Sequence, residues 1–102
     1  MEKDINTMTI ADVMATEAFD KRLQARVDQF KGVKDLKPVC REVLKLTLED
    51  IKNSYAECVA GTCKRFSLVQ RQFIRMMIES SLRAEIKALK RNQENNDKIS
   101  KQ

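Results

Sequence analysis

The chain has 102 residues, of which 42% are apolar and 34% are charged, with 20 Lys and Arg against 15 Asp and Glu. It contains no His or Trp, three Cys, two Gly and one Pro. This length predicts a single domain, and so few Gly and Pro argue against a turn-rich β-fold and against Gly-rich phosphate loops. Without His, the chain lacks the usual general base and the commonest metal ligand. We therefore expect no catalytic residues, no metal site, no cofactor and no small-molecule substrate.

The N-terminal segment does not look like an export signal. Its first residues include Glu2, Lys3 and Asp4, and no apolar stretch follows them as it would in a secretory signal peptide. Nowhere does the chain approach the roughly 18 consecutive apolar residues of a membrane span. We expect a cytoplasmic protein without membrane contact, in which the three Cys are reduced.

The first apolar pattern covers residues 10–31. Apolar residues recur there at three- and four-residue spacing, which is typical of one face of an α-helix. Thr9 is suited to cap the start of this helix, and Gly32 is a natural stop. Thr16, followed by Glu17, offers a second helix start. The sequence therefore leaves open whether the first helix is broken near residue 15.

Two further helices are predicted, over residues 36–60 and 67–91. Pro38 fits the first turn of the second helix, and Gly61 follows its end. The second helix carries two adjacent apolar rows, which indicates neighbours on two sides. Ser67 and Gln70 form the capping box that opens the third helix.

These patterns predict an all-α fold. We expect a bundle of three main helices, near residues 10–31, 36–60 and 67–91, in which short connections favour antiparallel neighbours. Residues 92–102 are almost entirely polar and are predicted to form a disordered tail. The domain organisation expected is thus one helical domain over 1–91 followed by that tail.

Positive charge is concentrated in the third helix. Up to Cys63 the chain has 10 basic and 11 acidic residues, whereas from Lys64 to Arg91 it has eight basic and two acidic residues. Five of the basic residues stand at four-residue steps, with Glu79 at the remaining step: Arg71, Arg75, Arg83, Lys87 and Arg91. One interpretation is a solvated face on which Glu79 pairs with Arg75 and Arg83. The other is a set of phosphate contacts to nucleic acid, although no helix-turn-helix signature is present.

The second half of the third helix also carries apolar residues that need cover. The row formed by Val69, Phe73 and Met77 continues as Ser81 and Glu85, so we expect the first half of the helix to be buried and the second half to project. That leaves three apolar side chains to be covered by another subunit, by a partner protein or by the first helix: Leu82, Ile86 and Leu89.

The sequence therefore predicts a non-catalytic helical interaction or assembly module. We expect it to self-associate or to dock a protein partner through Leu82, Ile86 and Leu89. The alternative is a nucleic-acid-associated protein that contacts phosphates through the basic residues of the same helix. Cys58 and Cys63 flank Gly61 and could approach each other across the turn, either as a redox pair or as buried or idle thiols.

Overall fold

The computed structural model describes the backbone of residues 7–100 and the side chains of residues 7–94. It contains five α-helices and, within the described residues, no strand. The helices are α1 (Ile10–Met14), α2 (Glu17–Lys31), α3 (Pro38–Leu44), α4 (Leu48–Ala60) and α5 (Leu68–Ser100). The prediction of an all-α fold is confirmed, but the prediction of three main helices is only partly right, because the first two are each divided.

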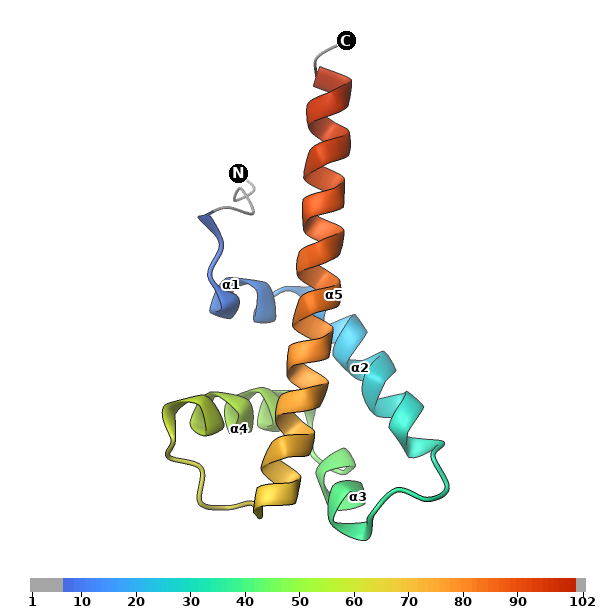
Figure 1. Cartoon of the computed structure of the whole chain (residues 1–102), viewed down its shortest axis with the longest axis vertical. Helices are drawn as coiled ribbons and strands as arrows, with labels where there is room; N and C mark the ends of the chain where they lie inside the picture. Colours follow the sequence, from blue (N-terminus) through green and yellow to red (C-terminus); the bar gives the residue numbers. More distant parts are fainter. Residues whose placement is uncertain (1–6, 101–102) are drawn as a thin grey trace.

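Helix α5 is the axis of the molecule (Figure 1). It has 33 residues, which at 1.5 Å per residue correspond to about 50 Å, close to the 54 Å length of the molecule. Helices α3 and α4 pack near its start, α2 crosses it, and α1 lies beside its middle (Figure 1). The C-terminal part of α5 therefore projects beyond the other four helices.

The first predicted helix is broken at Ala15, one of the two outcomes that the sequence left open. The Thr16 hydroxyl accepts a hydrogen bond from the Phe19 amide at 3.1 Å and donates one to the Val13 carbonyl at 2.7 Å. Thr16 thus closes α1 and caps α2 with one side chain. The break also directs Val13 and Phe19 into the same core, where both are buried.

The prediction of one continuous helix over 36–60 was wrong. The chain leaves the helical conformation after Leu44 and re-enters it at Leu48, with Thr47 in an extended conformation at the junction. The Thr47 hydroxyl accepts a hydrogen bond from the Asp50 amide at 3.1 Å, which satisfies an amide that would otherwise lack a partner. Because the turn redirects the chain, α3 and α4 pack near the same end of α5 in different directions (Figure 1).

Replacing Thr47 by Ala is expected to lower the free energy of unfolding by about 1 kcal/mol, because the first turn of α4 loses its cap. Urea denaturation followed by circular dichroism measures this change. Thr62→Ala is the matched control, since the Thr62 hydroxyl only donates a long 3.4 Å bond to the Glu57 carbonyl in an exposed loop. Equal effects of the two substitutions would contradict the capping role of Thr47.

Helix α5 begins as predicted and ends later than predicted. The Ser67 amide donates to Gln70 Oε1 at 3.0 Å and the Gln70 amide donates to Ser67 Oγ at 3.3 Å, so the capping box is present. The helix continues to Ser100, so residues 92–100 are helical instead of an unstructured tail. Lengthening an existing helix adds one hydrogen bond per residue fixed, and polar residues such as Gln, Glu and Lys oppose it only weakly. Residues 101–102 lie outside the described part.

The core lies where the shorter helices meet the first half of α5. The Phe30 ring of α2 contacts the Phe73 ring edge to face, with centroids 5.0 Å apart. The most deeply buried apolar side chains come from α2, α3, α4 and α5: Phe19, Leu23, Val43, Ile51, Ile74, Met77 and Ile78. Within the described residues, none of the helices is both long enough and apolar enough to cross a membrane.

Candidate functional site

The three apolar residues predicted to bind a partner lie against the chain's own core. Leu82 is only 5% exposed and belongs to the same buried cluster as Val13 of α1. Ile86 and Leu89 are half-buried and pack against that cluster. Helix α1 contacts α5 and lies beside its middle (Figure 1), so it is placed to contribute to this cover. The role of these residues in binding a partner stays a prediction, and Leu82 has little surface left for it.

The basic residues of α5 divide into two groups. In the first half, Arg75 Nε lies 3.5 Å from Glu79 Oε2. The Nε atom of Arg71 is buried and has no hydrogen-bond partner among the described residues. The Tyr55 hydroxyl of α4 donates to Glu79 Oε2 at 3.4 Å. Arg71 and Arg75 both lie close enough to Cys58 of α4 for their charges to act on its thiol, so this half of the predicted ladder borders α4, although Arg75 remains exposed.

The second group lies on the projecting half of α5. Arg83, Lys87 and Arg91 are exposed, and Lys90 joins them although the four-residue spacing did not include it. At about 100° per residue, Arg83, Lys87 and Lys90 fall within a sector of about 60°, and Arg91 lies about 40° beyond it. The seven-residue interval from Arg83 to Lys90 is the signal that identifies Lys90.

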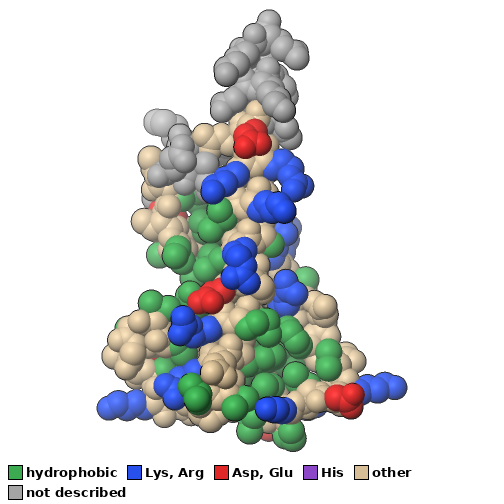
Figure 2. Space-filling model, in the orientation of Figure 1, with side chains coloured by type: hydrophobic (Ala, Val, Ile, Leu, Met, Phe, Trp, Pro, Cys, Tyr) green, Lys and Arg blue, Asp and Glu red, His purple; other side chains and the backbone are tan. Residues whose placement is uncertain are grey.

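We call these four residues the basic face of α5: Arg83, Lys87, Lys90 and Arg91. None of them makes an ion pair or hydrogen bond with another side chain among residues 7–94. Glu79, which was expected to pair with Arg83 as well as Arg75, has an ion pair only with Arg75 in the described part. Positively charged side chains are visible along the projecting part of α5 (Figure 2). Glu94, exposed one turn beyond Lys90, is the nearest acid on this side.

Glu85 does not neutralise the basic face, because it points toward α2. Its side chain is 6% exposed, and its Oε1 atom accepts a 2.6 Å hydrogen bond from Arg22 Nε. Ser81, one turn earlier, is also buried. The inference that these two polar residues mark the end of the buried part of the helix was wrong, because α2 packs over both and supplies the ionic partner for Glu85.

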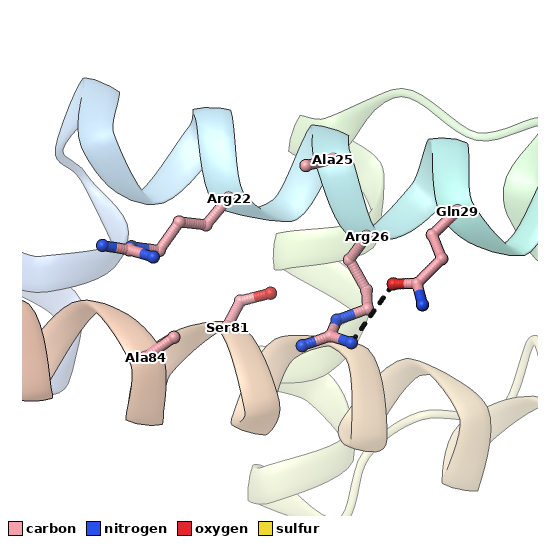
Figure 3. A pocket seen from close by; sticks show the side chains of 6 residues that line it. All are labelled: Arg22, Ala25, Arg26, Gln29, Ser81 and Ala84. Atoms are coloured by element: carbon pink, nitrogen blue, oxygen red, sulfur yellow. Dashed lines mark hydrogen bonds between the residues drawn. The ribbon is translucent and has the colours of Figure 1, made fainter.

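A small cavity opens beside this ion pair, between α2 and α5 (Figure 3). Its volume is about 230 Å³, and it is lined by Arg22, Ala25, Arg26, Gln29, Ser81 and Ala84. The floor is made of small side chains, and two guanidinium groups stand around it. Ala84 precedes Lys87 by three residues, which makes the two neighbours on the helix surface. The cavity therefore adjoins the basic face.

Two titratable groups near the first half of α5 are held in their protonated form. Burial raises the pKa of the Tyr55 hydroxyl, and the negative charge of Glu79 raises it further. Burial also raises the pKa of the Cys58 thiol, and a hydrogen bond with the Cys63 thiol adds to this effect. The two thiols approach each other as expected, and both are free. A protonated thiol is a weak nucleophile.

No protein-family model, curated protein sequence or solved structure matches the chain. Among the described residues, no three His, Cys, Asp or Glu side chains are grouped so that they would hold a metal ion. What the arrangement offers chemically is a set of exposed positive charges beside a polar cavity, a combination that attracts anions electrostatically.

Proposed function

We propose that the protein is a non-catalytic binding module that holds the phosphate backbone of a nucleic acid against the basic face of α5. The observation that carries this proposal is the set of four exposed cations that lack an ionic partner among residues 7–94. Arg and Lys in such a position neutralise phosphates and release the counterions condensed on the nucleic acid, which favours binding irrespective of base sequence.

The arrangement of charges favours the interpretation that the basic face binds a polyanion over the interpretation that it is only solvated. A solvated helix face usually alternates acids and bases at three- or four-residue spacing. Here Lys87 stands three or four residues from Arg83, Lys90 and Arg91, so like charges are neighbours and repel weakly. The two acids between Lys64 and Arg91, Glu79 and Glu85, already have partners in Arg75 and Arg22. The exposed Glu94 follows the last residue of the basic face by three positions.

The dimensions of the basic face match a duplex. From Arg83 to Arg91 the helix rises about 12 Å, along which duplex DNA presents roughly seven phosphates at one charge per 1.7 Å. The four side chains of the basic face are exposed, and the C-terminal part of α5 extends past the other helices (Figure 1). Four simultaneous phosphate contacts are therefore sterically reasonable.

The test is fluorescence anisotropy with a labelled 20-base-pair duplex of arbitrary sequence at several salt concentrations. Four phosphate contacts predict a slope of about −3.6 for log affinity against log salt, which corresponds to a roughly 100-fold loss of affinity from 50 to 200 mM. A second duplex of unrelated sequence should give a similar curve. No binding at 50 mM salt would overturn the proposal.

A second candidate is assembly through the apolar side of the projecting helix. It is favoured by one observation, that Ile86 and Leu89 remain half-exposed on a helix that extends past its neighbours. In this case a second copy or a protein partner would complete the cover that α1 begins. The two candidates differ in their response to salt, since apolar association is not weakened by it.

For this candidate, Ile86→Ser combined with Leu89→Ser should convert an oligomer into a helical monomer, as measured by light scattering and circular dichroism. Leu82 is unsuitable for the test because it is buried in the core. Val59→Ser, at an apolar residue of α4 that is 61% exposed, is the control and should leave the mass unchanged. Wild-type protein that is monomeric at high concentration would refute assembly through this surface.

A further inference from the structure

The Ser81 hydroxyl at the base of the cavity has no hydrogen-bond partner among the residues whose side chains are described. The residue is 2% exposed, and its Oγ atom is buried against α2. Figure 3 shows the side chain pointing from α5 toward α2, with the Arg22 and Arg26 side chains on either side of it. Buried hydroxyls without a partner are uncommon and destabilise a fold, so each one calls for an explanation such as a bound water, ion or ligand.

The guanidinium groups of Arg22 and Arg26, beside Ser81, each have N–H groups that are not used in the hydrogen bonds found among the described residues. Arg22 is held by Glu85 through Nε alone, so both of its terminal nitrogens are free to bind an anion. Arg26 makes one long hydrogen bond, from Nη1 to Gln29 Oε1 at 3.4 Å, which a stronger acceptor would readily replace. With Glu85 counted against the two arginines, the surroundings of the cavity keep a net charge of +1.

We propose that this cavity binds a phosphate group, held by the terminal nitrogens of Arg22 and Arg26 and by the Ser81 hydroxyl. Arginine forks suit the tetrahedral oxygens of phosphate, and hydrogen bonds to a charged acceptor are stronger than those between neutral groups. Glu85 acts as a positioning residue, because it fixes the Arg22 side chain beside the cavity. The Ser81 Oγ atom is buried in the structure, so a phosphate contacts it only after the half-buried Arg26 side chain has rotated away.

The inference that the phosphate belongs to a nucleic-acid backbone rests on the proposed function. A nucleic-acid backbone lying on Lys87 and Arg91 passes beside Ala84, which lines the cavity. One of its phosphates then enters between α2 and α5. A free phosphate ion or a phosphorylated small molecule would offer the same chemistry from a different source, and the experiment separates these sources.

The first experiment is isothermal titration calorimetry of the full chain with inorganic phosphate, at an ionic strength held constant with chloride. Ser81→Ala and Arg26→Gln should each weaken phosphate binding by about tenfold, the effect of losing one hydrogen bond to a charged group. Lys34→Gln, at an exposed residue between α2 and α3 that belongs neither to the cavity nor to the basic face, is the control and should bind phosphate as the wild type does. Wild-type protein that does not bind phosphate, or variants that bind it equally well, would overturn the proposal.

Ser81→Ala also gives a readout that separates a binding role from a structural one. Since the hydroxyl has no partner in the free protein, its removal should leave the melting temperature unchanged or raise it, while phosphate affinity falls. A lower melting temperature would show that the hydroxyl already has a structural partner, and would overturn the argument from Ser81.

The second experiment repeats the titration with the 20-base-pair duplex. If the cavity receives a backbone phosphate, Ser81→Ala and Arg26→Gln should weaken duplex binding as well, and inorganic phosphate should compete. Phosphate binding without duplex binding would refute the proposed function and leave the cavity as a site for free or small-molecule phosphate. Duplex binding that neither substitution nor phosphate affects would refute the cavity and leave the proposed function standing.

Discussion

Replacing Arg22 by Ala is expected to lower the free energy of unfolding by about 3 kcal/mol. The reason is the position of its partner. Glu85 has a side chain only 6% exposed, and the 2.6 Å contact with Arg22 Nε is its ion pair. Without Arg22, the carboxylate would remain buried under α2 with no charge to compensate it. Urea denaturation of both proteins at neutral pH measures the difference.

Replacing the other partner of the ion pair, Glu85, should lower the free energy of unfolding by less. In Glu85→Gln, the remaining Arg22 side chain is 41% exposed and can reach water, so we expect a loss of about 1 kcal/mol. Combining the two substitutions should recover part of the stability lost in Arg22→Ala, because no unpaired charge remains buried. Arg26→Ala, one turn along α2 and without an acidic partner among the described residues, is the matched control. Equal losses in Arg22→Ala and Arg26→Ala would contradict the account of Glu85.

The helical content and most helix ends were predictable because local chemistry determines them. Thr9 and Ser67 form the capping boxes that their spacing indicates. Gly61 adopts the left-handed conformation, with φ of 75°, at the end of α4, where the Thr62 amide donates to the Glu57 carbonyl and completes a Schellman motif. These signals act within six residues and need no knowledge of the fold.

The break at residues 45–47 could not be read from the apolar pattern. Apolar residues continue at helical spacing through Leu46 and Ile51, so the periodicity indicates one helix. The decisive signal is Thr47 followed by Asp50, and such a pair also occurs inside helices. The turn also brings both α3 and α4 into contact with α5, and the apolar pattern does not reveal this packing.

The burial of Ser81 and Glu85 was unpredictable for another reason. In sequence, polar residues that replace an apolar row indicate exposure. Their burial depends on Arg22, which is 63 residues from Glu85 along the chain and is brought close only by the crossing of α2 and α5. The cavity beside them could not be predicted from the sequence either, because it forms only where α2 crosses α5.

Three of the four residues of the basic face could be predicted from the sequence. The four-residue spacing correctly drew attention to Arg83, Lys87 and Arg91, but it grouped them with Arg71 and Arg75, which lie beside α4. A helix turns every 3.6 residues, so a strict four-residue ladder drifts around the helix and does not stay on one face. The contacts made by α4 decide where along the ladder the exposed face begins.

We propose that the projecting half of α5 neutralises nucleic-acid phosphates. The salt dependence of duplex binding measures how many phosphates are neutralised. The variant is Arg83→Gln with Lys87→Gln, in which Gln preserves helix propensity and removes two charges. The matched control is Lys34→Gln with Lys37→Gln, which removes the same charge from the connection between α2 and α3, at the opposite end of the molecule (Figure 1).

The measurement is the slope of log affinity against log salt for the wild type and the two variants. Each lost phosphate contact contributes about 0.9 to this slope, so Arg83→Gln with Lys87→Gln should reduce its magnitude by about 1.8. The control should keep the wild-type slope. Equal reductions in the two variants would show that binding follows net charge and not the basic face of α5, and would contradict the account.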